Sequence, residues 1–352
     1  MKADHLIIGQ GIAGSLLARL LLRGGRSVLV IDDGHAGSSS RAAAGIINPV
    51  TGMRMVKSWM IDELIPAAQQ VYGKIEQEAD AQILFPCPVV DFFQTRDAEA
   101  LFQSRSEQEP EYLSLPEDTG EWQQYFRYPY GVGQIAPAFY VQLRVLQQHV
   151  RGLLQAHHAY REEKFDQEQL QLTGQGVIYK DITAQNIVFC DGADGENNRW
   201  FGALPWSKDK GEAIIVSIPG LPRNRIYKYG LSIVPWQDGD LFWVGARHDW
   251  KYIDMQPTAT FRQQVAGLLD SWLQLPYVIV DHLVARRPAN VDRKPFLGFH
   301  PRYPQVGICN GFGGKGCSLA PYFVRSMVQH MVHGNALPAE VSISRFARIL
   351  SR

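Results

Sequence analysis

The beginning of the chain carries its clearest pattern of apolar and polar positions. Apolar residues 6–8 lead directly into a G-x-G-x-x-G motif at residues 9–14, and leucines at helical spacing continue as far as Gly24. A second apolar run, residues 27–31, ends at Asp32. The pattern predicts a strand, a tight glycine turn, a helix and a second strand. In this context the glycine motif indicates dinucleotide binding.

Each glycine of the motif has a physical role. Gly9 permits the tight turn, Gly11 lets the backbone approach a pyrophosphate, and Gly14 lets the helix lie close to the strand. The helix N-terminus offers unpaired N–H donors and a partial positive charge to the phosphates. Asp32 stands where a carboxylate can accept hydrogen bonds from ribose hydroxyls.

The rest of the chain alternates strand-like and helix-like segments. Residues 83–93 predict a strand that is bent or at a sheet edge, because Pro86 and Pro88 interrupt it. Residues 186–190 predict a third buried strand of the first domain. Between these, Pro137 is expected to open a helix that runs to about residue 154. Further helices are predicted over 62–78 and 256–273, and further strands over 130–135, 213–218 and 277–285, with hairpins at 166–179 and 230–245.

A second glycine-rich loop, residues 311–316, lies between a predicted strand and a helix that runs to about His333. It provides a second helix N-terminus that favours anions. One dinucleotide needs only one pyrophosphate cradle, whereas a reduced flavin ring carries negative charge at its far end. The second loop therefore favours a flavin over a nicotinamide cofactor, although an NAD-dependent dehydrogenase stays an alternative.

The composition of the chain argues against several classes of protein. The 352 residues include 35 Lys plus Arg and 35 Asp plus Glu, so the formal net charge is zero. The chain therefore has no overall positive charge that would attract nucleic acid or an anionic membrane. No apolar run reaches the length of a membrane span, and no signal peptide is expected. The four cysteines lack C-x-x-C spacing, which is typical of reduced thiols in a cytoplasmic protein. His330 and His333 have no evident third partner, so no metal site is expected.

The order of these motifs resembles the D-amino-acid-oxidase-like family of FAD enzymes, especially its glycine oxidase and sarcosine oxidase branch. It is also similar to the oxidase half of the bifunctional tRNA wobble-uridine modification enzyme. Beyond the first motif, the resemblance rests on residues 40–45 (Ser-Arg-Ala-Ala-Ala-Gly) and 210–212 (Lys-Gly-Glu). It rests also on the Arg-Pro segment at 287–298 and on residues 310–316 with Ala320-Pro321.

The resemblance implies an α/β (α+β mixed) fold, in which a Rossmann-like FAD-binding domain is interleaved with a substrate domain built on a large mixed, mostly antiparallel sheet. We expect the FAD-binding domain to comprise 1–80, 145–213 and 288–352, and the substrate domain 81–144 and 214–287. The implied reaction is oxidation of a small amine or amino acid, with hydride transfer from the carbon next to nitrogen to flavin N5 and hydrolysis of the imine. FAD is expected to be non-covalent, because the flavin-linking cysteine of sarcosine oxidases is replaced by Arg286 and Arg287.

Arg287 is the main expected substrate residue, because the arginine of this motif holds the substrate carboxylate in the glycine oxidase branch. Arg286 and Arg287 end a predicted strand and so point to opposite faces, which allows only one of them into a pocket. Asn48 and Lys315 are weaker substrate candidates. The expected cofactor-binding residues are Gly9, Gly11, Ile12, Ala13, Gly14, Asp32, Asp33, Ser40, Arg41, Ala43, Ala44, Gly45, Gly192, Gly311, Gly313, Gly314, Lys315 and Gly316.

Departures from the family pattern leave alternatives open. Sarcosine oxidases have a lysine that assists oxygen where this chain has Trp243, so the electron acceptor is either O2 or another compound. The segment 48–59 matches none of these relatives well and either borders the substrate or is a packed connector. A tRNA-modifying oxidase acting on a carboxymethylaminomethyl-type nucleoside and a non-catalytic flavoprotein are the alternative functions.

Overall fold

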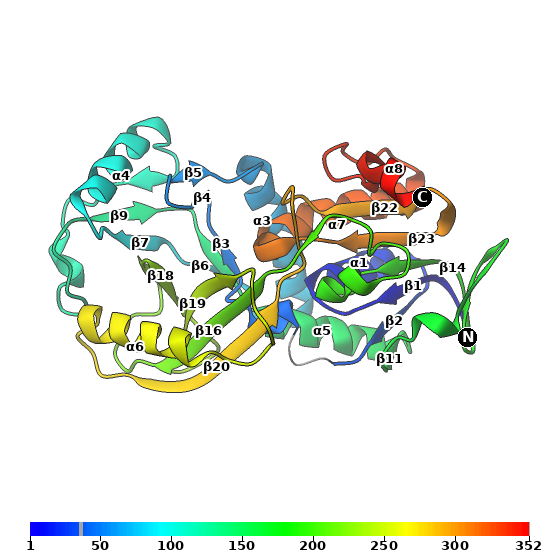
Figure 1. Cartoon of the computed structure of the whole chain (residues 1–352), viewed down its shortest axis with the longest axis horizontal. Coiled ribbons are helices and arrows are strands. Elements are labelled where there is room, and N and C mark those ends of the chain that lie inside the picture. The colour runs from blue at the N-terminus through cyan, green and yellow to red at the C-terminus, as the bar shows by residue number, and fades with distance from the viewer. Residues whose placement is uncertain (35–37, 352) are drawn as a thin grey trace.

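Two eight-stranded sheets organise the chain in the computed structural model, which describes residues 1–34 and 38–351 (Figure 1). The first sheet has the order β11-β2-β1-β14-β13-β12, and β23 joins it by pairing with β14 and β22. Its strands are β1 (Lys2–Ile8), β2 (Val28–Asp32), β11 (Tyr160–Glu162), β12 (Leu170–Thr173), β13 (Gly176–Tyr179), β14 (Ile182–Phe189), β22 (Phe296–His300) and β23 (Tyr303–Asn310).

The centre of the first sheet is parallel and buried on both faces. β1 pairs in parallel with both β2 and β14, so that Leu6 lies beside Leu29 and Ile187. Alternate residues of β1 belong to different apolar clusters on the two faces. This burial explains why the strands appear in the sequence as continuous apolar runs.

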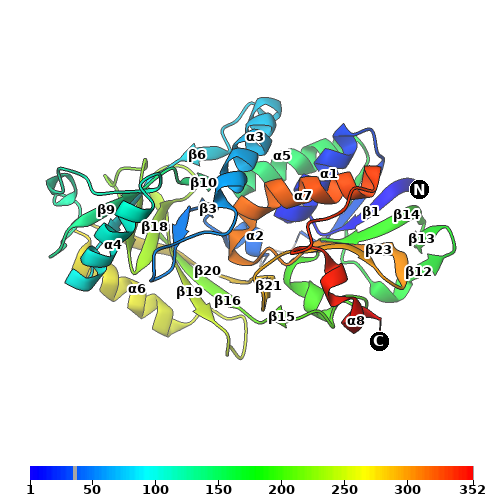
Figure 2. The same cartoon turned by 90° about the horizontal axis from the view of Figure 1, so that it is seen from above.

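The helices α1, α3, α5 and α7 pack on one another beside this sheet, as Figures 1 and 2 show. α1 (Ile12–Arg23) contacts both α5 (Leu143–Ala156) and α7 (Gly316–His333). α3 (Ile61–Ala79) packs against α7 in turn. α1 enters the core through Leu16, Leu17 and Leu21, each fully buried, which confirms the periodicity expected after the glycine motif. The two short helices of this lobe are α2 (Ser39–Ala42) and α8 (Ala347–Leu350).

The second sheet is mixed and mostly antiparallel, with the order β20-β16-β19-β18-β17-β7-β9-β8. Only β17 and β7 pair in parallel among the strands described in this sheet. α6 (Ala259–Trp272) covers one face through Phe261, Val265 and Leu269, and α4 (Arg96–Gln108) lies near β8 and β9. The strands are β7 (Val89–Phe92), β8 (Leu113–Ser114), β9 (Val132–Ile135), β16 (Lys210–Ser217), β17 (Ile226–Tyr229), β18 (Leu231–Pro235), β19 (Leu241–Asp249) and β20 (Val278–Arg286).

Short strands join the two lobes and correct two expectations. The predicted strand over 83–93 is two strands, β6 (Leu84–Pro86) and β7, in different sheets, and β7 is an interior strand. The helix expected to open at Pro137 begins only at Leu143, because Phe139–Val141 form β10 and pair with β6 and β3. The remaining short strands are β3 (Ile46–Ile47), β4 (Val50–Thr51), β5 (Val56–Lys57), β15 (Trp206–Ser207) and β21 (Ala289–Asn290).

The two sheets also bear on where the domains divide. A boundary at residue 213 would cut β16, which pairs along its whole length with β19 and β20 of the second sheet. We therefore propose that the second segment of the substrate domain begins at about Lys210. Because α5 begins at Leu143, we also propose that the first segment ends at about Gln142, and we keep the other proposed boundaries. Within residues 1–34 and 38–351, no helix is both long and apolar enough to cross a membrane.

Candidate functional site

Two adjoining cavities lie along the carboxyl ends of β1 and β14 and extend to the second sheet. The glycine-motif cavity, about 790 Å³, is lined by Gly9, Asp32 and Asp33 among others. The interlobe cavity, about 300 Å³, is lined by residues of both lobes, including Trp243 and Arg287. Gly11, Ser39, Ser40, Cys190 and Gly192 line both cavities, so the two adjoin one another. Together their linings extend from the glycine motif to the second sheet.

The glycine motif has the conformation that the sequence predicts. Gly9 has a φ of +94°, and a Cβ atom there would lie 2.5 Å from the carbonyl oxygen of Cys190. A Cβ atom on Gly14 would lie 1.9 Å from the carbonyl oxygen of Gly9, so α1 approaches the turn closely. Ile12 N donates to Ser40 Oγ at 3.1 Å, and both Ile12 and Ala13 line the interlobe cavity. The start of α1 thus borders the cavities directly.

Asp32 is fixed by the loops around it. One carboxylate oxygen accepts from Gln10 N at 2.7 Å and the other from Gly34 N at 2.9 Å, while Arg151 Nη2 lies 3.4 Å away. These bonds hold the carboxylate at the wall of the glycine-motif cavity, where a ribose can reach it.

The second glycine loop borders the interlobe cavity beside the end of β20, where Gly313 N donates to Pro288 O at 3.0 Å. Gly313, Gly314 and Gly316 line it, and Gly311 and Gly313 have φ values of +78° and +57°. Ala43, Ala44 and Gly45 line the same cavity from the segment that precedes β3. These six residues therefore border the interlobe cavity, whereas Gly311 is not among the described residues that line either cavity.

Three of the candidate side chains lie elsewhere. Lys315 Nζ donates to Ser58 Oγ at 2.9 Å and lies 3.3 Å from Thr51 Oγ1, which ties the second loop to the segment 48–59. Asn48 Oδ1 accepts from Val50 N within that segment. Arg41 Nη1 donates to Gly34 O at 2.7 Å. None of Lys315, Asn48 and Arg41 is among the described residues that line the two cavities.

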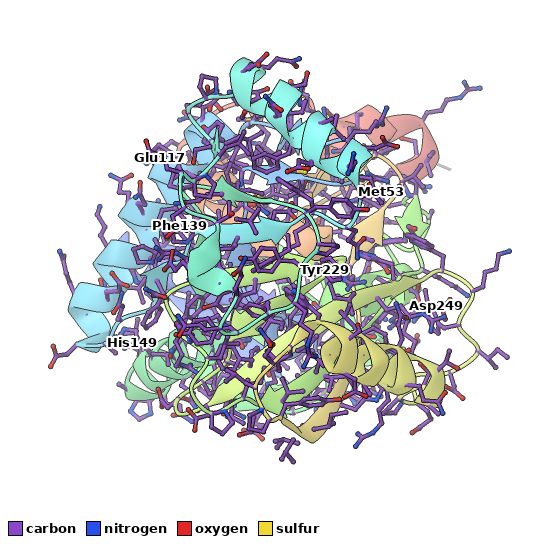
Figure 3. The ribbon with its side chains drawn as sticks, turned by 90° about the vertical axis from the view of Figure 1, so that its left-hand side faces the viewer. Met53, Glu117, Phe139, His149, Tyr229 and Asp249 are labelled. Atoms are coloured by element: carbon purple, nitrogen blue, oxygen red, sulfur yellow. The ribbon has the colours of Figure 1, made fainter. Side chains whose placement is uncertain are left out.

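The β4–β5 turn reaches the surface. Met53 is 95% exposed at the tip of this turn. In Figure 3, Met53 and Asp249, the last residue of β19, lie on the same side of the molecule. The segment 48–59 therefore has a solvent-facing turn whose two flanks, at Thr51 and Ser58, both contact Lys315. None of its residues is among the described residues that line the two cavities.

Arg286 and Arg287 line different cavities, as the alternation of side chains along a strand predicts. Arg287 lines the interlobe cavity, whereas Arg286 lines the glycine-motif cavity and pairs with Asp194 and Glu196. Arg287 Nη1 lies 2.9 Å from Asp209 Oδ1. A Cβ atom on Gly211 would lie 2.6 Å from an Arg287 guanidinium nitrogen, so the glycine of the Lys-Gly-Glu motif makes room for this arginine.

Sequence reasoning missed several residues of the interlobe cavity. Glu212 and His248 line it, and Asp209 stands behind His248 with its Oδ2 3.0 Å from His248 Nδ1. In the sequence, only their positions could have pointed to them: Asp209 directly precedes the Lys-Gly-Glu motif, and His248 follows Gly245 by three residues. Trp243 Nε1 donates to Ala42 O at 2.9 Å, so the indole links the second sheet to the residue that precedes Ala43, Ala44 and Gly45.

Asp191, two residues beyond the end of β14, lies in the wall of the glycine-motif cavity. Its carboxylate accepts from Asn310 Nδ2 at 2.7 Å and Asn198 Nδ2 at 3.0 Å. Burial raises the pKa of Asp191 from 3.8 to about 6, against the lowering effect of these two hydrogen bonds.

This raised pKa predicts a pH-dependent stability difference between the protein and an Asp191→Asn variant. Because the folded pKa lies above the unfolded value, the contribution of Asp191 is greatest below about pH 4 and is lost as the pH rises through about 6. Relative to the variant, the protein should lose at most about 3 kcal/mol of unfolding free energy between pH 4 and 8. Urea unfolding of both proteins across this range measures it, and a constant difference would contradict the assignment.

A parallel sheet with a glycine motif, with adjoining cavities that extend to a second sheet, defines a two-lobed nucleotide-binding protein. The family model of FAD dependent oxidoreductases matches residues 4–329. The chain belongs to this family and is an FAD-dependent oxidoreductase.

Solved structures share the fold over nearly the whole chain. Glycine oxidase from Geobacillus kaustophilus is 18% identical, with 98% of each chain covered and a TM-score of 0.78. L-proline dehydrogenase from P. horikoshii is 17% identical, with 99% of this chain and 98% of that chain covered and a TM-score of 0.76. Iminodiacetate oxidase from Chelativorans sp. BNC1 is 23% identical, with 98% of each chain covered and a TM-score of 0.75.

The residues present fit FAD. The two adjoining cavities border a carboxylate and a helix N-terminus, the groups that suit a ribose and a pyrophosphate. A Cβ atom added to Gly192 or Gly313 would meet no protein atom within 4 Å, so both glycines border open space that a bound nucleotide would occupy.

Proposed function

We propose that this protein oxidises a small amine or amino acid that carries a carboxylate, removing a hydride from the carbon next to nitrogen. The observation that supports this most is the guanidinium of Arg287 at the wall of the interlobe cavity. A planar guanidinium can hold a carboxylate through two parallel hydrogen bonds. The fold neighbours named as oxidases or dehydrogenases of glycine, iminodiacetate and L-proline add support, since each of these compounds combines an amine with a carboxylate.

We assign the nucleotide half of FAD to the glycine-motif cavity, with Asp32 at a ribose and the start of α1 at the pyrophosphate. The flavin half is assigned to the interlobe cavity, between the alanine segment (Ala43–Gly45) and the second glycine loop. When bound, FAD supplies the two-electron acceptor. We infer that FAD binds non-covalently. Cys190 and Cys317 line the interlobe cavity, and burial raises the pKa of both thiols. Neither thiol therefore forms the nucleophilic thiolate readily.

In this proposal the protein mainly positions the substrate. Arg287 orients the carboxylate, and Asp209 orients Arg287. Trp243, 6% exposed and anchored to Ala42 O, forms a rigid apolar wall that limits the size of the substrate and excludes water.

The decisive experiment is an absorption spectrum of the purified protein followed by anaerobic addition of glycine, sarcosine, L-proline, iminodiacetate and D-amino acids. Flavin absorption that bleaches with one of them would support the proposal and identify the substrate class. Flavin absorption that none of them bleaches would favour the tRNA-modifying or non-catalytic alternatives. A salt titration of RNA binding then separates those two, because phosphate contacts weaken steeply with salt.

We further propose an electron acceptor other than O2. Trp243 is neutral, and Arg287 is already balanced by Asp209, so neither offers a free positive charge to a developing oxygen anion. After reduction with dithionite, the flavin should be reoxidised several-fold more slowly by air-saturated buffer than by an artificial dye acceptor at equal concentration. Stopped-flow absorbance measures both rates, and faster reaction with oxygen would assign the protein to the oxidases.

A further inference from the structure

Asp209, His248 and Arg287 form a compact polar group at the interlobe cavity. His248 Nδ1 lies 3.0 Å from Asp209 Oδ2 and 3.1 Å from Asp209 Oδ1. Arg287 Nη1 lies 2.9 Å from Asp209 Oδ1 and 3.1 Å from His248 Nδ1. The Asp209 side chain is 6% exposed and that of His248 is 48% exposed, with its ring stacked on Trp250. The buried carboxylate thus stands behind a histidine that the cavity and solvent can reach.

These distances favour one tautomer of His248. If Nδ1 lacked a proton, its lone pair would face the two carboxylate oxygens of Asp209 within 3.1 Å, which is unfavourable. The N–H of Arg287 would be the one favourable contact that these three distances give it. If Nδ1 carries the proton, it donates a charge-assisted hydrogen bond to Asp209, and Arg287 keeps its own bond to the same carboxylate. The neutral ring then has its lone pair on Nε2, the nitrogen on the ring edge away from Asp209.

A base at this position has a chemical purpose. A substrate ammonium has no free electron pair on nitrogen, so it must lose a proton before the adjacent carbon can release a hydride. Arg287 and Asp209 cancel each other in charge, so the group does not repel a substrate ammonium as an unpaired arginine would.

Resting on the function proposed above, we propose that His248 is the catalytic base that deprotonates the substrate ammonium, with Asp209 as its positioning residue. In this step one N–H bond of the ammonium breaks and its electron pair stays on the amine nitrogen. The proton forms a new bond with His248 Nε2, and the imidazolium is stabilised by Asp209. No oxidant or reductant takes part in this step.

The first test reads the tautomer and needs no substrate. The FAD-bound protein labelled with 15N-histidine is examined by NMR at about pH 8.5, above the ordinary histidine range. The His248 signals are assigned by their absence in His248→Gln. A proton on Nδ1 that shifts to Nε2 in Asp209→Asn supports the proposal. A proton on Nε2 in the unmodified protein would overturn it, whatever amine the protein oxidises.

The second test uses whichever amine bleaches the flavin in the experiment above. His248→Gln should reduce the rate of anaerobic flavin reduction at pH 7 by roughly 10²- to 10⁴-fold. The loss should become several-fold smaller at about pH 9.5, because a larger fraction of the substrate is then free amine with its own lone pair. His282→Gln is the matched control, since His282 also pairs with a buried carboxylate, Glu212 at 2.9 Å, but is not among the described residues that line the cavity.

The outcomes of the two tests are distinct. An equal loss of rate at both pH values, or an equal loss in His282→Gln, would overturn the role of His248. If no amine bleaches the flavin, the proposed function fails, and the NMR result still decides whether His248 is poised as a base.

Discussion

Gly14→Ala is expected to abolish FAD retention and to destabilise the fold by about 3 kcal/mol or more. The new Cβ atom would lie 1.9 Å from the carbonyl oxygen of Gly9 and 3.3 Å from Cys190 Cβ. Both neighbours belong to the rigid junction of β1, α1 and β14, so relief requires α1 to move away from the sheet. That movement displaces the helix N-terminus from the cofactor cavities.

Gly152→Ala provides the matched control for this prediction. Gly152 also lies inside a helix, α5, but a Cβ atom there meets nothing within 4 Å. This change should stabilise the protein by about 0.5–1 kcal/mol, because alanine loses less backbone entropy than glycine. Flavin absorbance after gel filtration and thermal unfolding measure both variants. A Gly14→Ala protein that keeps its FAD and its melting temperature would contradict the packing described for the motif.

Arg287→Gln is expected to weaken the binding of carboxylate ligands by roughly 10- to 150-fold. A hydrogen bond to a charged group contributes about 1.5–3 kcal/mol, and the variant loses one such bond. Glycolate, a carboxylate without an amine, tests this without turnover through its effect on the flavin absorption spectrum. An active amine should show the same loss in kcat/KM, because the carboxylate contact is present in both ground and transition states.

Arg286→Gln distinguishes a specific contact from a general loss of charge. Arg286 is the neighbouring arginine, but it lines the glycine-motif cavity and pairs with Asp194 and Glu196. Its replacement should alter the affinity for FAD and leave glycolate binding to the FAD-saturated protein close to that of the unmodified protein. Equal loss of glycolate binding in both variants would show that Arg287 is not the carboxylate receptor.

The local elements of the first lobe could be predicted because each depends on a few neighbouring residues. The turn at Gly9 needs a positive φ, α1 needs leucines at helical spacing, and a parallel strand needs an apolar run. Elements that depend on distant partners were predicted less well. Phe139 lies in a strand because it pairs with Ile47 and Pro86, residues far away along the chain that no local pattern around Pro137 contains.

The same distinction holds for the candidate site. Alternation along a strand predicted that Arg286 and Arg287 would separate, and the two cavities confirm it. The glycine loops likewise follow from backbone requirements that are visible in sequence. In contrast, Lys315 stands in a glycine loop yet reaches Ser58, because its long side chain leaves the loop for a partner that only the tertiary fold provides.

The nucleotide-binding motif, the second glycine loop, the mixed α/β fold and the family resemblance are therefore all visible in the sequence, since they rest on local spacing and order. Which side chains meet at the interlobe cavity depends instead on the tertiary fold. Asp209, His248 and Arg287 come from three separate segments, and they meet because β16, β19 and β20 pair in one sheet. Such contacts depend on the pairing and register of distant strands, which local patterns of apolar and polar residues do not encode.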